Sequence, residues 1–226
     1  MALGGNGTLS GAAVFGEEFD VPVVGAPCTI DNDLYGTDYT IGYDTAVNTA
    51  LDAIDIIRDT ADSHDRVFFI EVMGHDSGHI AVPCAIGGGA EVVVTPESQM
   101  AVADLISSIQ QGWQRSKTSS IVLVAEGEVE EGATQVAAKV KAALPHMDAR
   151  VSIIGHVQRG GAPTAKDRML ASRLGIACVE GLLEGQRNVM AGLVNGELVY
   201  TPISETISRK KLISSGYMEM MDILSV

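Results

Sequence analysis

Residues 67–78 read VFFIEVMGHDSG, an apolar run that passes into a polar loop bounded by glycines. The run from Val67 to Val72 is rich in β-branched and aromatic residues, which favours a buried strand. The loop Met73–Gly78 leads into a further helix-like stretch. A buried strand followed by a polar loop and a helix is typical of parallel α/β proteins.

The same alternation of strand and helix extends in both directions along the chain. Further strands are predicted at Val21–Gly25, Glu91–Thr95, Ile121–Ala125 and Val151–Gly155. Helices are predicted at Asp44–Ala61, Gln99–Trp113, Ala133–Leu144 and Ala165–Leu183. This order predicts right-handed βαβ units and a mostly parallel sheet.

Local signals mark several element ends. Asp44 is the predicted N-cap of the first helix, where a carboxylate satisfies free backbone N–H groups. Thr164 with Asp167 three residues later forms a capping-box pattern ahead of the last predicted helix. The sequence VNGE at residues 194–197 predicts a two-residue hairpin turn.

Composition and charge exclude some classes of partner. The net charge of −14 argues against nucleic acid and anionic membranes, which require a basic face, although a phosphate pocket needs only a few local cations. Three widely spaced cysteines favour a reducing compartment over a disulfide framework. No signal peptide or membrane-spanning apolar stretch is recognisable, so we expect a soluble cytoplasmic protein.

The first residues have the pattern of a strand-to-helix turn. Residues 3–8 read LGGNGT, but almost no strand sequence precedes them. A natural domain rarely begins at such a turn. We therefore expect that Met1 is an internal start or that an upstream portion has been lost.

Four polar clusters fall beyond the carboxyl ends of strands, at the edge where α/β sheets bind ligands. They are the loops at residues 4–8, 27–33, 73–78 and 156–161. The first is either a plain tight turn or a phosphate-binding helix start. The second, with Asp31 and Asp33, is either an Asx-rich turn or a general base beside a metal-organising acid. His156 and Arg159 form a plausible anion clamp.

Taken together, these segments resemble the 6-phosphofructokinase family, of the ATP-dependent bacterial type. The likeness covers essentially the whole chain and rests on these stretches: PCTIDND at 27–33, GTDYTIG at 36–42, RDT at 58–60, SHDR at 63–66, EVMG at 71–74, GGGAE at 87–91, GHVQRGG at 155–161, and Asp167-Arg168. The resemblance implies two Rossmann-like three-layer domains with mostly parallel sheets. The first is incomplete, because the opening third of the family pattern is absent.

The resemblance also implies roles for particular residues. Asp31 matches the base that takes the proton of the sugar 1-hydroxyl as it attacks the γ-phosphate, with Thr29 and Asp33 holding the transferred group. The remaining residues that match the fructose 6-phosphate site are Met73, Gly74, His75, Glu126, His156 and Arg159, with Arg66 and Arg150 reaching it from a neighbouring subunit. A homotetramer with shared active sites is therefore expected.

Two further sites are implied. The nucleotide loop, for ATP and Mg²⁺, matches Gly5, Asn6, Gly7, Thr8 and Gly11, with Asn6 at the metal position. An effector site, for a nucleoside diphosphate or phosphoenolpyruvate, matches Arg58, Gly89, Glu91, Arg115 and Lys117. Without the resemblance, these last five residues would be taken as ordinary solvated surface.

Three positions depart from the family pattern. Asn6 stands in place of an Asp that binds Mg²⁺, and a neutral amide is a weaker ligand for that ion. His75 replaces an Arg, which removes a permanent positive charge. Cys28 stands where ATP-using members usually have Gly and pyrophosphate-using members have Lys. Gly7 favours ATP as the donor, because the pyrophosphate type has an Asp there.

The expected activity is therefore a glycolytic kinase that makes fructose 1,6-bisphosphate from ATP and fructose 6-phosphate. Two alternatives stay open: a catalytically silent sugar-phosphate-binding or regulatory module, and a pyrophosphate-dependent phosphofructokinase. By the family pattern, residues 1–42 and 155–205 belong to the nucleotide-binding domain. Residues 43–154 and 206–226 belong to the sugar-phosphate-binding domain.

Overall fold

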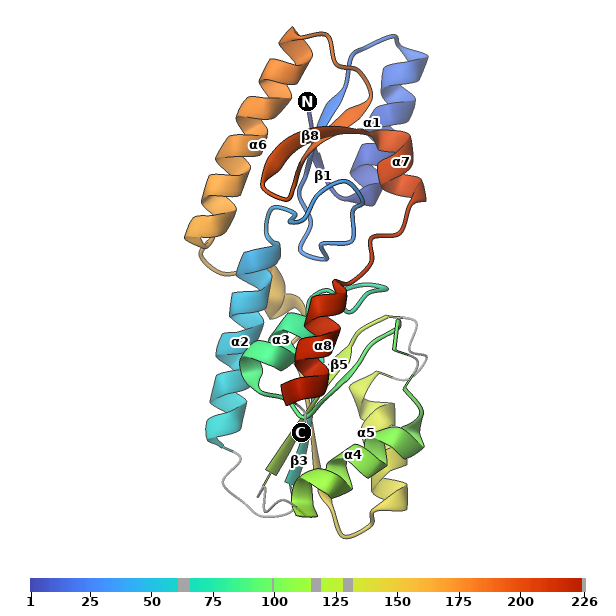
Figure 1. The fold of residues 1–226 in the computed structure, drawn as a ribbon, viewed down its shortest axis with the longest axis vertical. Helices are drawn as coiled ribbons and strands as arrows, with labels where there is room; N and C mark the ends of the chain where they lie inside the picture. The colour runs from blue at the N-terminus through green and yellow to red at the C-terminus, as the bar shows by residue number, and fades with distance from the viewer. Residues whose placement is uncertain (61–65, 99, 115–118, 128–131, 225–226) are drawn as a thin grey trace. The chain divides into compact units, whose positions relative to one another are not determined.

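The chain divides into two compact units, each built on its own sheet (Figure 1). In the computed structural model, the described residues are 1–60, 66–98, 100–114, 119–127 and 132–224. Unit 1 comprises Met1–Thr45 and Ala162–Leu212, and unit 2 comprises Ala46–Gly161 and Ile213–Val226. The predicted mixed α/β class with mostly parallel sheets is confirmed.

Unit 1 contains a four-stranded sheet in the order β1-β2-β7-β8. Its strands are β1 (Ala2–Gly4), β2 (Val24–Pro27), β7 (Val189–Val194) and β8 (Glu197–Pro202). The first three strands run parallel, and β8 pairs antiparallel with β7. Its helices are α1 (Asn6–Glu18), α6 (Ala165–Leu183) and α7 (Ile203–Ser208).

The sheet of unit 1 is covered on both faces. Alternate residues of a strand point to opposite faces, so Val24 packs with Leu174 of α6 while Val23 packs with Leu9 of α1. Ile203 of α7 joins the second cluster. Helix α6 therefore covers one face, and α1 with α7 covers the other, which gives three layers (Figure 1).

Unit 2 contains a fully parallel sheet in the order β4-β5-β3-β6. Its strands are β3 (Arg66–Val72), β4 (Val92–Val94), β5 (Ser119–Ala125) and β6 (Asp148–Ile153). Its helices are α2 (Tyr43–Asp59, which begins in unit 1), α3 (Ala81–Gly88), α4 (Val102–Gln114), α5 (Ala133–Ala143) and α8 (Ser215–Leu224). The apolar core includes Phe69 of β3, Ile109 of α4 and Val140 of α5, all fully buried.

Several sequence predictions are confirmed. Helix α6 spans the predicted residues, and the Thr164 side chain accepts a hydrogen bond from the Asp167 N–H at 3.2 Å. The hairpin between β7 and β8 turns at Asn195 and Gly196, whose φ angles of 52° and 81° match a type I′ turn. Strands β3, β4 and β5 lie within two residues of their predicted bounds.

Three predictions were wrong in detail. Strand β2 begins at Val24 rather than Val21, because the Val21 N–H is occupied by the Gly16 carbonyl at the end of α1. Asp44 is not an N-cap, since α2 already begins at Tyr43; its carboxylate instead accepts a hydrogen bond from the Thr164 hydroxyl at 2.7 Å.

The third error concerns β6, which was predicted at residues 151–155 and lies at residues 148–153. The strand ends early because Gly155, at a φ of 55°, turns the chain into the short 3₁₀ helix η1 (Gly155–Arg159). The predicted helix ends at Ala61 and Gln99 lie outside the described residues. Within the described residues, no helix is long and apolar enough to cross a membrane.

Gly192 shows how closely a loop approaches the sheet of unit 1. A Cβ at this position of β7 would lie 2.2 Å from the Gly36 carbonyl oxygen. The loop is held there by two hydrogen bonds, Asp38 N–H to the Leu193 carbonyl at 2.7 Å and Leu193 N–H to the Thr37 hydroxyl at 3.1 Å. The polar segment after β2 is therefore fixed directly onto the sheet.

We predict that Gly192→Ala lowers the free energy of unfolding by about 2 kcal/mol, because the new methyl group overpacks this contact. Gly175→Ala is the matched control, since a Cβ there meets no described atom within 4 Å. That control should gain up to about 1 kcal/mol from its position in a helix. Urea denaturation followed by circular dichroism measures both variants. Equal stability of the two variants would contradict the close approach.

Candidate functional site

The predicted nucleotide loop forms the start of α1, at the carboxyl end of β1. Gly5 is the N-cap residue and offers no side chain, so the first-turn N–H groups of the helix have no side-chain cap. A helix start of this kind carries partial positive charge and binds anions. A Cβ at Gly7 or Gly11 would meet no described atom within 4 Å, which leaves this helix face open.

The Asp31 loop begins where β2 ends, next to that helix start. The Thr29 hydroxyl donates to the Asp31 carboxylate at 3.0 Å and accepts from the Asp31 N–H at 3.3 Å. The Thr29 Cβ lies 3.3 Å from the position that a Cβ on Gly5 would occupy. The structure therefore brings the predicted nucleotide loop and the predicted catalytic loop together within unit 1.

A buried amide holds the middle of the Asp31 loop. Asn32 is only 4% exposed and has a φ of 53°, in the left-handed region that Asn tolerates. Its Oδ1 accepts from the Thr40 N–H at 2.9 Å, and its Nδ2 donates to the Asp38 carbonyl at 3.2 Å. The sequence analysis gave Asn32 no role; the DND triplet, a pattern in which Asn often bonds to its own loop, was the available signal.

The Asp167 carboxylate does not take the capping-box role predicted for it, because the Thr164 N–H donates to the Thr45 hydroxyl at 3.2 Å instead. This carboxylate is 3% exposed and accepts hydrogen bonds from the Gly42 N–H at 2.9 Å and the Thr45 N–H at 2.8 Å. The Thr45 hydroxyl donates to it as well. Asp167 thus links the start of α6 to Gly42 and Thr45, where α2 begins.

Cys28 lies between β2 and Thr29. Its thiol is exposed, yet partial burial of its surroundings and the negative charge of Asp167 both raise its pKa. Cys28 is therefore a thiol rather than a thiolate at neutral pH, and adds no negative charge beside the start of α1.

In unit 2, several predicted sugar-site residues meet at the carboxyl ends of β3 and β5. Met73 is buried, and its N–H donates to the Gln158 Oε1 at 2.8 Å. The Glu126 N–H donates to the Val72 carbonyl at 2.8 Å, and the Glu126 carboxylate accepts from the His75 N–H at 3.4 Å. The sequence analysis missed Gln158, which is 1% exposed and joins η1 to the end of β3.

His156 and Arg159 lie on η1, which follows β6, and both are exposed. Gly74, at a φ of 150°, lets the loop after β3 fold back so closely that a Cβ there would lie 2.6 Å from the Ser77 carbonyl oxygen. His75 is also exposed, and its Nδ1 lies 3.2 Å from the Asp76 carboxylate.

Arg66 and Arg150 lie elsewhere in unit 2. Both contact the Asp148 carboxylate at 3.1 Å, near the amino end of β3. Desolvation works to raise the pKa of Asp148, but the hydrogen bonds and charges of Arg150 and Arg66 outweigh it and lower that pKa. Arg66 begins β3, about 20 Å from Met73 beyond its other end, and Arg150 pairs with Phe68 in the first half of the same strand. The two arginines therefore do not join the sugar-site cluster of their own unit.

The predicted effector residues are only partly described. A Cβ on Gly89 would lie 2.8 Å from a guanidinium nitrogen of Arg58, so these two residues are neighbours. The Glu91 carboxylate accepts from the Ile121 N–H at 2.6 Å at the edge of the sheet. Arg115 and Lys117 lie outside the described residues. The effector site stays a prediction.

Metal ligands are sparse in the described part of the chain. It contains no group of three His, Cys, Asp or Glu side chains that would hold an ion. Asn6, the predicted Mg²⁺ position, is exposed at the start of α1 and offers only an amide oxygen. These residues do not form a protein-only magnesium site, since Mg²⁺ needs hard oxygen ligands in octahedral geometry.

Comparison with known proteins identifies relatives along the whole chain. The family model described as Phosphofructokinase matches residues 1–182. The chain is 56% identical over 225 residues to an ATP-dependent 6-phosphofructokinase of Cytophaga hutchinsonii, covering all of this chain and 69% of the relative. It is 53% identical over 229 residues to ATP-dependent 6-phosphofructokinase 1 of Thermus thermophilus, covering all of this chain and 70% of that protein.

Solved structures agree on the fold. A phosphofructokinase structure from Saccharomyces cerevisiae matches with a TM-score of 0.84 at 28% identity, covering 98% of this chain and 33% of that one. A pyrophosphate-dependent phosphofructokinase from Marinobacter aquaeolei matches with a TM-score of 0.79 at 23% identity, covering 98% of this chain and 66% of that one. The second match shows the fold alone.

We predict that iodoacetamide modifies Cys28 more slowly at neutral pH than it modifies free cysteine, because the raised pKa lowers the thiolate fraction. The labelling rate should rise as the pH passes above the pKa of a free cysteine thiol. Cys84 is fully buried with a pKa of about 12, and should stay unmodified in the folded chain. Peptide mass spectrometry follows each site, with the urea-unfolded chain as the control. Rapid labelling of Cys28 at neutral pH would contradict this electrostatic account.

Proposed function

The chain belongs to the phosphofructokinase family, and we propose that it transfers the γ-phosphate of ATP to the 1-hydroxyl of fructose 6-phosphate. The observation that carries this proposal is the contact between the α1 start at Gly5 and the Thr29–Asp31 pair. It sets an anion-binding helix end beside a carboxylate with a hydroxyl partner. The high identity to two proteins named ATP-dependent 6-phosphofructokinase supports the donor and the acceptor.

Asp31 is the proposed general base. Its Oδ2 already accepts a hydrogen bond from Thr29, which leaves Oδ1 available to a substrate hydroxyl. As the sugar oxygen forms its bond to the γ-phosphorus, the hydroxyl proton passes to Asp31. The bond between that phosphorus and the β–γ bridging oxygen breaks, and ADP leaves with the bond's electron pair. Positioning and charge stabilisation supply most of the rate in such reactions.

Thr29 and Asp33 would hold the transferred group and its surroundings on either side of this base. The N–H groups of Asn6, Gly7 and Thr8 would bind the nucleotide phosphates at the start of α1. When bound, Mg²⁺ would neutralise phosphate charge, with phosphate and water oxygens as most of its ligands and Asn6 supplying at most one. Gly7 supports ATP rather than pyrophosphate, since its open surroundings leave room for a nucleotide.

Unit 2 would bind the sugar phosphate. We assign the hexose to Met73, Gly74, His75 and Glu126, because these residues gather at the carboxyl ends of β3 and β5. His156 and Arg159 would bind the 6-phosphate through charge-assisted hydrogen bonds. Unit 1 would then carry the nucleotide and unit 2 the sugar.

The proposal also includes a homotetramer and an effector site. Arg66 and Arg150 would serve the 6-phosphate of a neighbouring subunit in a homotetramer, which fits their separation from Met73 within one unit. The Arg58–Gly89 neighbourhood would form part of a site for a nucleoside diphosphate or phosphoenolpyruvate effector. The proposed location is the cytoplasm, where these metabolites are found.

We predict that the purified chain forms ADP from ATP, Mg²⁺ and fructose 6-phosphate, and forms no product when pyrophosphate replaces ATP. Asp31→Ser should lower kcat by about 10²–10⁴-fold, the usual contribution of a general base. Calorimetric affinity for fructose 6-phosphate should stay within about threefold, because only the proton acceptor is removed.

The matched control for this experiment is Asp55→Ser, which removes an exposed carboxylate on α2. Its turnover should equal that of the wild type. Unchanged turnover in the Asp31 variant would rule out Asp31 as the base. Sugar-phosphate binding heat without any ADP from the wild type would instead support a silent binding module.

The metal position offers a second prediction. Asn6→Asp adds a carboxylate at the start of α1 and should lower the Mg²⁺ concentration for half-maximal ATP binding by about tenfold, the effect of one charge-assisted ligand. Ser10→Asp places the same charge one helical turn further along α1 and should change this value little. Calorimetric titration of ATP at a series of Mg²⁺ concentrations measures both variants. An equal effect of the two variants would show general electrostatics rather than ligation at residue 6.

A further inference from the structure

We propose that Lys211 is a positioning residue for the Asp31 loop, acting through the side chain of Asn32. This inference rests on the proposed function, because it assigns Asp31 to the reacting groups. Lys211 is 179 positions from Asn32 in the sequence. It lies two residues before the chain leaves unit 1, and the sequence analysis gave it no role.

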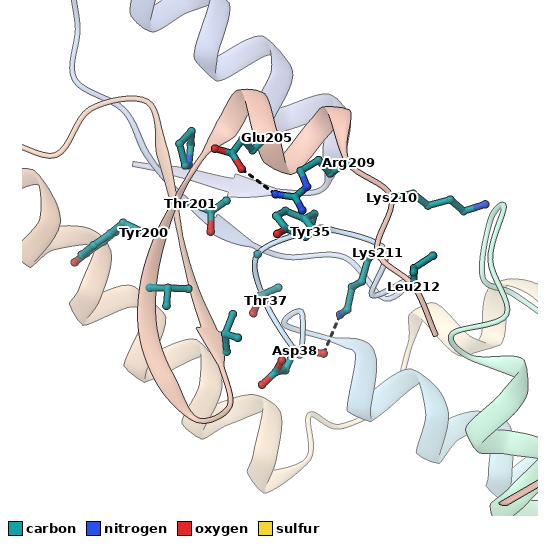
Figure 2. A pocket seen from close by; sticks show the side chains of 14 residues that line it. Tyr35, Thr37, Asp38, Tyr200, Thr201, Glu205, Arg209, Lys210, Lys211 and Leu212 are labelled. Atoms are coloured by element: carbon teal, nitrogen blue, oxygen red, sulfur yellow. Dashed lines mark hydrogen bonds and ion pairs between the residues drawn. The ribbon is translucent and has the colours of Figure 1, made fainter. Parts of the chain in front are cut away.

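The ammonium of Lys211 makes two short contacts with the Asp31 loop. Its Nζ donates to the Asn32 Oδ1 at 2.8 Å and to the Asp38 carbonyl at 2.8 Å. Figure 2 shows the Lys211 side chain reaching Asp38 from the segment that follows α7. The neighbouring Lys210 forms an isolated antiparallel bridge with Leu34, so backbone pairing also fixes this segment beside the loop.

Asn32 transmits this restraint to the reacting residues. It stands between Asp31 and Asp33, and its left-handed backbone turns the chain at that point. Such a conformation is less stable for a residue with a side chain and persists when surrounding contacts hold it. The Thr40 N–H and the Lys211 ammonium both donate to Asn32 Oδ1, which fixes the side chain from two directions.

The hydrogen bonds around Asn32 distinguish a positioning role of Lys211 from a role in the stability of the fold. Without Lys211, the Asn32 Oδ1 would still accept from the Thr40 N–H, and the Asp38 carbonyl would still accept from the Asn32 Nδ2. Neither acceptor would be left without a donor. A variant at Lys211 should therefore keep its fold while the loop around Asp31 gains freedom, which separates an effect on turnover from one on stability.

The positive charge of Lys211 also favours a positioning role. The loop carries the carboxylates of Asp31, Asp33 and Asp38, and the Lys211 ammonium offsets their mutual repulsion. Burial lowers the pKa of Lys211 to about 8, while Asp38 and Asp33 act to raise it. The ammonium is therefore charged at neutral pH and loses its proton in mildly alkaline solution.

Other charged and titratable groups surround the same ammonium. Lys211 lines a pocket of about 700 Å³ in unit 1 (Figure 2). The other charged or titratable side chains of that pocket are Tyr35, Asp38, Tyr200, Glu205, Arg209 and Lys210. The Arg209 guanidinium already pairs with Glu205 at 3.2 Å and lies 3.9 Å over the Tyr35 ring. Its positive charge is thus engaged by Glu205 and the Tyr35 ring, whereas the Lys211 nitrogen contacts Asn32.

The test compares Lys211→Met with Lys210→Met, which removes the exposed neighbouring charge. We expect Lys211→Met to lower kcat by about tenfold at an unchanged melting temperature, with KM for both substrates within about twofold. Lys210→Met should match the wild type. Lys211→Arg should recover much of the lost kcat, and its kcat should hold to higher pH than that of the wild type, because guanidinium stays charged above pH 8.

A double-mutant cycle tests whether Lys211 acts through Asn32. Asn32→Gly permits the left-handed backbone but removes the acceptor, so it should lower kcat to a similar degree. The double variant should lose no more than the Asn32 variant alone, since the two changes break one connection. Fully multiplicative losses would overturn the proposed route. The Asn32 variant also carries the comparison if Lys211→Met does not fold.

Hydrogen exchange separates failure of this proposal from failure of the proposed function. The amides of residues 31–40 should exchange faster in Lys211→Met than in the wild type, while those of β3 stay unchanged. This measurement needs no turnover, so it decides the Lys211 contact even if the wild type forms no ADP. Exchange equal to the wild type, or a kcat within about twofold of it at neutral pH, would overturn the positioning role.

Discussion

The buried amide of Asn32 is the constraint on which the rest of the candidate site depends. A loop that leaves a parallel sheet must find partners for backbone groups that no longer pair with a strand. Asn32 supplies two of them, by accepting from the Thr40 N–H and donating to the Asp38 carbonyl. The loop is consequently closed between residue 32 and residues 38–40, and Asp31 stays paired with Thr29 beside the start of α1.

Unit 2 uses the same device at the end of its own sheet. There the buried Gln158 accepts a hydrogen bond from the Met73 N–H, and joins η1 to the loop after β3. In both units a primary amide is buried where a strand ends, and it contacts the backbone of a loop with proposed substrate contacts. A neutral amide suits this task because it avoids the cost of burying a charge. Asn32 donates and accepts at once, whereas Gln158 only accepts, and its buried Nε2 has no hydrogen-bond partner among the described residues.

Electrostatics in this acidic chain is local rather than global. The net charge of −14 would repel phosphorylated substrates at long range. Attraction must therefore come from short-range groups, namely the helix start at Asn6 and the exposed Arg159 of η1. Lys211 acts differently in this account: it is directed toward the loop and compensates for the carboxylates gathered there.

The sequence by itself determined those features that short stretches of chain control. The α6 cap at Thr164, the turn at Asn195-Gly196 and the apolar runs of β3 and β5 all depend on neighbouring residues, and the predictions for them were confirmed. Tertiary structure decided the rest. The Asp167 and Lys211 contacts join residues more than a hundred positions apart. Such contacts depend on the order in which the strands pair in the sheet. No local pattern of residues encodes that order.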